Sequence, residues 1–116
     1  MRASGYAPLA ALLIFLASPA ESEIIKLKCV DAHGVPVVQY VIDTHRQRVG
    51  QILAGGRITQ PSVTSITESH VRFIDRSGDA PTNNRLNRAT GELTSEIIEG
   101  PERGVSLYLS CRRSDE

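Results

Sequence analysis

The chain has 116 residues, a formal net charge of zero and 41% hydrophobic residues, with two Cys and no Trp. This length fits one domain and excludes an enzyme built around a cleft between two domains. The balanced charge gives no electrostatic reason to bind nucleic acid or an anionic membrane.

Residues 1–20 have the layout of a secretory signal peptide, with a basic start, an apolar stretch and small residues before the cleavage site. The apolar run Leu9–Ala17 has nine residues, and Ser18-Pro19-Ala20 follows it. A membrane-spanning helix needs about 20 residues, so this run is too short to cross a bilayer. We expect cleavage after Ala20, with Ser22 as the alternative, and a soluble periplasmic or secreted protein with no membrane insertion after cleavage.

Residues 21–116 are predicted to form a single β domain. Only Arg2 of the 13 basic residues is removed with the signal, so 12 basic residues remain against 13 acidic ones, a net charge of −1. The aromatic residues that remain are Tyr40, Phe73 and Tyr108. The core must therefore consist mainly of Val, Ile and Leu.

Short runs of alternating apolar and polar residues, separated by Gly, Pro, Asn and Asp, predict strands along the whole domain. Alternation places Val38, Tyr40 and Ile42 on one face of their strand, and Val71 and Phe73 face inward. The turn Ala89-Thr90-Gly91 contains a Gly that supplies positive φ. The predicted strands are 23–30, 35–43, 48–53, 63–67, 70–75, 85–88, 92–98 and a last one that ends near Cys111.

This spacing predicts an all-β fold, a single small antiparallel β-barrel or sandwich of about 7–8 short strands. No stretch of residues 21–116 combines helical apolar spacing with capping residues. The pair Gly55-Gly56 would cost a helix about 2 kcal/mol.

The two Cys allow one intramolecular disulfide, Cys29–Cys111, which an oxidising compartment would favour. Alternation puts Cys29 on the inward face with Ile25 and Leu27. It also puts Cys111 on the inward face, with Val105, Leu107 and Leu109. The bridge requires the first and last strands to be close, which indicates a sheet closed or nearly closed on itself. Neither a Cys-x-x-Cys motif nor zinc-ligand spacing is present.

The residues predict no catalytic, metal or cofactor site. The three His, at positions 33, 45 and 70, are not at metal-ligand spacing. There is no Gly-x-Ser-x-Gly motif, and Gly55-Gly56 lacks the Gly-Lys-Ser/Thr of a phosphate loop. We therefore expect a protein that is not an enzyme and holds no cofactor, although a small hydrolase with a perturbed His or carboxylate is an alternative.

Eleven of the 13 basic residues are Arg, and seven of them could form a basic face if their strands adjoin: Arg46, Arg48, Arg57, Arg72, Arg76, Arg85 and Arg88. Binding of nucleic acid usually adds stacking aromatic residues to such a face. With three aromatics we expect no nucleic-acid binding. Docking of an acidic protein is the alternative for this face, since Arg is favoured at interfaces.

The most loop-like stretches are Arg76–Asn84 and Ala54–Pro61. Loops on a rigid scaffold often carry function, so we expect these two to contact another macromolecule, such as another envelope protein. If Arg76–Asn84 is only a contact surface, deleting Thr82–Asn84 should leave the fold intact. A rival arrangement has exposed edge strands that pair across subunits of an oligomer.

Several segments resemble a broad set of small exported bacterial proteins without an assigned activity: Leu27-Lys28-Cys29, Val41–Thr44, Ile66–Glu68, Val71–Phe73, Leu86–Leu93 and a late Cys. Many of those proteins carry a Leu/Tyr-x-(Asp/Asn)-Arg-x-Thr-Gly-x-Leu hairpin. The corresponding segment here is Leu86–Leu93, in which Asn87–Leu93 matches the last seven positions of that motif. The resemblance covers most of residues 21–116. It implies periplasmic residence and an antiparallel β fold, and it brings no activity.

A weaker resemblance is to the periplasmic inhibitors of c-type lysozyme, small β-barrels with Cys near both ends of the domain. That family presents a Ser-Gly-x-x-Tyr segment to the enzyme. Here Ser77-Gly78 is followed by Asp79-Ala80-Pro81, with no Tyr. Lysozyme inhibition is therefore the alternative function that the resemblance implies, and the departure falls on the functional loop.

Overall fold

A computed structural model describes residues 23–114, and the expected signal peptide, residues 1–20, lies outside this range. The described chain is all-β, as predicted, with one short 3-10 turn, Ala54–Gly56. Within residues 23–114, no helix is long and apolar enough to span a membrane. The strands are β1 (Ile24–Val30), β2 (Pro36–Asp43), β3 (Arg48–Ile52), β4 (Ile58–Thr59), β5 (Ser62–Ile66), β6 (His70–Asp75), β7 (Thr82–Asn87), β8 (Glu92–Ile97) and β9 (Ser106–Arg113).

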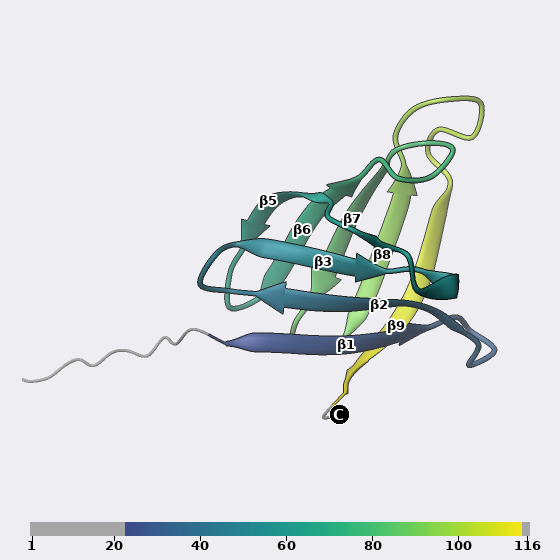
Figure 1. The fold of residues 1–116 in the computed structure, drawn as a ribbon. Coiled ribbons are helices and arrows are strands. Elements are labelled where there is room, and N and C mark those ends of the chain that lie inside the picture. The colour runs from purple at the N-terminus through teal and green to yellow at the C-terminus, as the bar shows by residue number, and fades with distance from the viewer. Residues whose placement is uncertain (1–22, 115–116) are drawn as a thin grey trace, which may run out of the picture.

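All nine strands belong to one antiparallel sheet in the order β4-β3-β2-β1-β9-β8-β7-β6-β5. The two edge strands, β4 and β5, are separated in the chain by only Gln60 and Pro61. The three peptide steps from Thr59 to Ser62 span at most about 11 Å, so the sheet must curl until its edges approach. It forms a half-barrel in which β1–β3 cross in front of β6–β9 (Figure 1), and β3 contacts β5.

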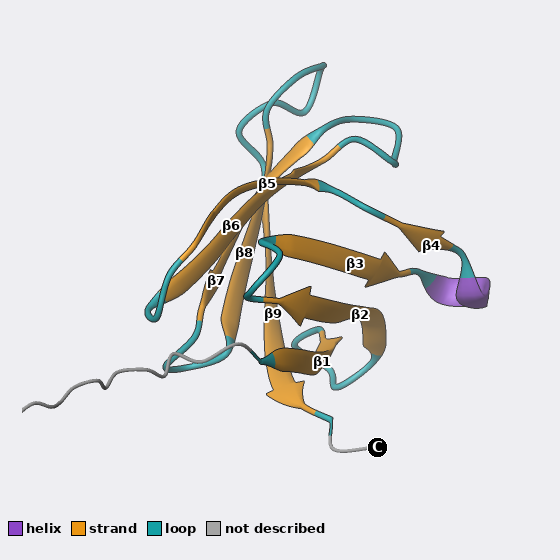
Figure 2. Ribbon diagram, turned by 60° about the vertical axis from the view of Figure 1, so that its left-hand side comes forward, coloured by secondary structure: helices purple, strands orange, loops and turns teal. Residues whose placement is uncertain are grey.

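Figure 2 shows the curl of the sheet from the side. The core lies inside this curl, where the alternating apolar side chains of both halves meet. The rings of Tyr40 on β2 and Phe73 on β6 pack edge to face, with centroids 5.2 Å apart. These strands are distant in the sheet order, so this contact joins the two halves of the sheet. The buried apolar residues are Ile25, Leu27, Cys29, Val38, Tyr40, Ile42, Val49, Val71, Phe73, Leu86, Leu93, Leu109 and Cys111.

The predicted disulfide is confirmed. Cys29 on β1 and Cys111 on β9 lie directly opposite each other in the register, and their Sγ atoms are bonded at 2.02 Å. Both Cys are buried in the core. The first and last strands are neighbours in the middle of the sheet, so the bond joins adjacent strands and not the two edges.

The structure has nine strands where about 7–8 were predicted, and one predicted loop boundary was wrong. The additional strand is β4, which has two residues and lies inside the stretch that was expected to be a loop, 54–61. Thr82–Asn84 belongs to β7 and not to a loop. The Asn84 side chain is buried and donates hydrogen bonds to the carbonyl and hydroxyl of Thr82. A polar residue therefore takes an inward-facing position of this strand, and apolar alternation does not detect it.

The predicted burial of Val105 and Leu107 was also wrong. Val105 precedes β9 and is 55% exposed, and Leu107 is 51% exposed although it shares the parity of Leu109 and Cys111. The reason is that β1 pairs with β9 only from Ser110 to Arg113. The front strands therefore do not cover the part of β9 that contains Leu107.

Candidate functional site

Gln51, at the end of β3, is a buried polar residue that joins the two halves of the sheet. Its side-chain amide donates to Asp75 Oδ2 at 2.8 Å and to Thr59 Oγ1 at 3.2 Å. It is only 2% exposed, and a buried amide needs such partners. Because β3 and β6 are not neighbours in the sheet, the bond to Asp75 fixes the approach of one half to the other.

Asp75 is held from two sides. Its Oδ1 accepts hydrogen bonds from the backbone N–H of Ser77 at 2.9 Å and from the Ser77 hydroxyl at 2.6 Å. Burial by itself raises the pKa of Asp75. The hydrogen bonds from Ser77 and Gln51, with the positive charge of Arg57, outweigh burial and leave that pKa below its usual range. The carboxylate therefore stays ionised at neutral pH and keeps both sets of bonds.

Burial also raises the pKa of Tyr40, and the negative charge of Asp75 adds to the effect. Tyr40 therefore stays neutral over the whole physiological range. Gln51 and the residues around it therefore form a fixed structural support, called here the base of the loops. Asp75 and Tyr40 are not a proton-transfer pair, since neither side chain titrates near neutral pH.

The two loops expected from the sequence both connect to this base. Loop 54–61 reaches it through Thr59, and loop 76–81 begins beside Asp75 and is tied to it by Ser77. A third loop, 98–105, lies beside loop 76–81 (Figure 1), where the Ile98 N–H donates to the Pro81 carbonyl at 3.1 Å. An exposed ion pair of 3.9 Å between Arg76 and Glu99 also links these two loops.

These three loops, called here the loop surface, combine exposed apolar and charged side chains. Ile58 is 69% exposed, because Thr59, its neighbour on β4, takes the inward position. Val105 is also exposed, and Leu107 lies just beyond it on β9. The charged residues of the loop surface are three of each sign: Arg57, Arg76, Arg103, Asp79, Glu99 and Glu102.

The three His occupy separate turns and are not brought together. His33 and His45 are exposed, and His70 is half-buried at the start of β6. Within residues 23–114, no group of three or more His, Cys, Asp or Glu side chains is placed to hold a metal ion.

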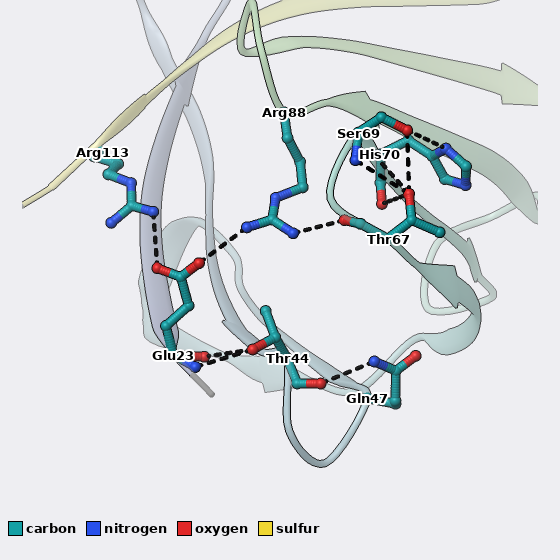
Figure 3. Close-up of polar contacts among 8 residues, drawn as sticks. All are labelled: Glu23, Thr44, Gln47, Thr67, Ser69, His70, Arg88 and Arg113. Carbon is teal, nitrogen blue, oxygen red and sulfur yellow. Dashed lines mark hydrogen bonds and ion pairs between the residues drawn. The ribbon is translucent and has the colours of Figure 1, made fainter. Parts of the chain in front are cut away.

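His70 does contact two hydroxyls, an arrangement that the sequence analysis missed. Its Nε2 lies 3.2 Å from Ser65 Oγ and its Nδ1 lies 3.3 Å from Ser69 Oγ. A catalytic Ser–His pair usually has a carboxylate on the second nitrogen to stabilise the imidazolium, and a hydroxyl cannot supply that charge. Thr67 Oγ1 accepts from the N–H groups of Ser69 and His70 (Figure 3), so these contacts order the β5–β6 turn.

The seven Arg singled out in the sequence do not form one basic face. Three are paired with acidic residues: Arg46 with Asp43, Arg76 with Glu99 and Arg88 with Glu23. Arg72 and Arg85 lie opposite each other on β6 and β7.

No known protein family, curated protein or solved structure matches the chain. The two resemblances drawn from the sequence therefore stay predictions. A functional assignment has to come from the geometry of the described residues.

Proposed function

We propose that the protein is a non-catalytic, exported binding domain that docks a protein partner of the cell envelope through the loop surface. The observation that carries this proposal is the bridge from Gln51 to Asp75 and Thr59. It anchors two loops that are separate in the sequence to one hydrogen-bonded base around the buried Gln51. Pre-ordered loops lose less conformational entropy on binding, which favours affinity.

The composition of the loop surface supports a protein as the partner. Interfaces between proteins combine apolar contacts with a polar rim, and Ile58 and Val105 stand among charged side chains in these loops. The charges of the two signs are equal in number, so the surface offers no general attraction to nucleic acid or to an anionic membrane.

Export is supported by the buried Cys29–Cys111 bond, since structural disulfides persist mainly in oxidising compartments. Absence of catalysis is supported by the chemistry of the titratable groups that the fold brings together. Asp75 is held as an anion by fixed hydrogen bonds, and within residues 23–114 the His70 ring contacts the hydroxyls of Ser65 and Ser69 and no carboxylate.

A photo-crosslinking residue placed at Ile58 or Val105 tests the proposal inside an expressing bacterium. We expect the same discrete cross-linked protein from both positions. The matched control places that residue at Arg72, which is exposed in the middle of β6 and outside the three loops. Identical products from all three positions, or none from the two loop positions, would contradict the proposal.

The lysozyme-inhibitor alternative makes a separate prediction, loss of c-type lysozyme activity at equimolar protein. In this chain the Ser77 hydroxyl is engaged with Asp75 in its own turn. We therefore expect lysozyme to keep its full activity. Loss of that activity at equimolar protein would show that the partner is lysozyme and not an envelope protein.

A further inference from the structure

A small cavity lies at the end of the half-barrel opposite the loop surface. The turns 67–69 and 88–91 lie at the ends of β6 and β7 remote from loop 76–81, because β6 runs from His70 to Asp75 and β7 returns from Thr82 to Asn87. The cavity has a volume of about 200 Å³. Its walls include the apolar side chains of Ile25, Leu27, Ile42 and Leu86, with Arg88 and Arg113 also lining it.

The two Arg meet on one carboxylate. Arg88 Nη2 donates to Glu23 Oε1 and Arg113 Nη2 donates to Glu23 Oε2, each at 3.1 Å (Figure 3). Two guanidinium groups therefore share a single negative charge, so the cluster carries a net charge of +1. A carboxylate already bound between two Arg shows that the arrangement fits this chemical group.

Arg88 keeps its position without Glu23. Its Nη1 donates to the Thr67 carbonyl at 2.6 Å, and its side chain is only 19% exposed. The Glu23 side chain is 42% exposed, so solvent weakens its ion pairs. The more buried cation is thus fixed and the more exposed anion is the group that can be replaced.

The backbone of Glu23 also stays in place when its side chain moves. The Glu23 N–H donates to Thr44 Oγ1 at 3.0 Å, and the Thr44 N–H donates to the Glu23 carbonyl at 3.1 Å. These bonds do not involve the carboxylate. Rotation of the Glu23 side chain into solvent would therefore open the pair of Arg without detaching the chain from β2.

We propose that this cavity binds a small monocarboxylate with a short apolar tail, whose carboxylate replaces the Glu23 side chain between Arg88 and Arg113. The tail lies against the apolar wall. A volume of 200 Å³ equals that of about six or seven water molecules at ~30 Å³ each, which suits a tail of about five carbons. Hexanoate is the probe that matches this size, and Glu23 acts as a built-in competitor.

The test measures binding of hexanoate to the purified exported protein by calorimetry and by methyl NMR shifts of Ile25, Ile42 and Leu86. In Glu23→Gln we expect affinity to rise by about tenfold, because the competing charge is gone. In Arg113→Gln we expect affinity to fall by about tenfold. The matched control is Arg112→Gln, since Arg112 is the exposed neighbour on β9 and does not line the cavity.

Acetate separates the head group from the tail. We expect it to bind at least tenfold more weakly than hexanoate and to leave the three sets of methyl signals unshifted. The proposal is overturned if Glu23→Gln shows no hexanoate binding at millimolar concentration, if acetate binds as well as hexanoate, or if Arg113→Gln and Arg112→Gln behave alike.

Discussion

Gly91 occupies a backbone position that suits no other residue. Its φ is +81°, in the left-handed region, as the turn Ala89-Thr90-Gly91 predicts. Its carbonyl accepts a hydrogen bond from the Cys111 N–H at 2.8 Å. A Cβ at this position would run into the carbonyl oxygen of Cys111, so the turn and the disulfide-bearing strand constrain each other.

Gly91→Ala should therefore destabilise the protein more than Gly55→Ala. Both positions have positive φ, which costs an L-residue about 1–2 kcal/mol, but a Cβ at Gly55 has no atom within 4 Å. The backbone clash at Gly91 adds about 1–3 kcal/mol, as overpacking does. Urea denaturation of the two variants measures the difference, and equal losses of stability would show that the Cys111 carbonyl does not crowd this site.

Asp75 predicts how stability depends on pH. Its folded pKa is lower than its unfolded value of about 3.9, so the unfolded chain takes up the proton first. The stability that Asp75 supplies is therefore complete above about pH 4 to 5 and is lost as pH falls through the folded pKa.

Asp75→Asn should be less stable than the parent protein at pH 6, with a difference that shrinks at pH 2.5. Urea denaturation at both pH values measures this. Asp79→Asn, which changes an exposed carboxyl in the adjacent loop, is the control and should show no such trend. A difference that stays constant or widens in acid would rule out a lowered pKa at Asp75.

Single residues also show where sequence reasoning stops. The positive φ of Gly91 follows from its local turn, and the burial of Tyr40 and Phe73 follows from alternation. Gln51 has the same inward parity as Val49, which was the one available signal for its burial. Its partner Asp75 is 24 residues away, and only the curl of the sheet brings the two together.

At the scale of elements, the strand that begins at Thr82 changes the expected result of a deletion. Thr82, Asn83 and Asn84 pair with residues of both β6 and β8. Removing them would break the ladder on two sides and shift every later inward residue of β7.

Deletion of Thr82–Asn84 should thus abolish cooperative folding, contrary to the expectation from composition. Deletion of Gly78-Asp79 is the control, because both are exposed in loop 76–81 and remote from the sheet ladder. Thermal unfolding followed by circular dichroism compares them. A sharp transition near the parent melting temperature in the Thr82–Asn84 deletion would mean that β7 tolerates a register shift.

Element types were predictable where apolar residues alternate, as in Val38–Ile42. They were not predictable where polar residues face inward, as Asn84 does in β7. The two-residue β4 has no periodicity to detect, because it exists only through pairing with β3. The loop surface was predicted in part. Its two main loops could be recognised because they are rich in turn residues, but the base that they share could not, because it depends on tertiary contacts such as Gln51–Asp75.

At the scale of the whole molecule, one bond limits the unfolded state of nearly the entire domain. The Cys29–Cys111 bond closes a loop of 82 residues. In the chain-entropy model such a loop stabilises the folded state by roughly 4.5 kcal/mol. Both Cys are also buried in the core, so the disulfide is shielded from solvent in the folded state.

The double variant Cys29→Ala/Cys111→Ala should lose roughly 4 to 5 kcal/mol of the free energy of unfolding. Guanidinium denaturation of the variant and of the oxidised parent measures the loss. The parent treated with reductant under denaturing conditions and then refolded is a second comparison with intact Cys side chains. A loss below about 1 kcal/mol in both would show that the sheet restrains the ends of the domain without the bond.

The proposed function requires that the chain is exported and closes its disulfide outside the cytoplasm. Native mass spectrometry of the protein recovered from the periplasm of an expressing bacterium tests it most directly. We predict a chain that begins at Glu21 and is lighter by two hydrogens than the reduced form. A mass that retains Met1, or one with two free thiols, would contradict the claim.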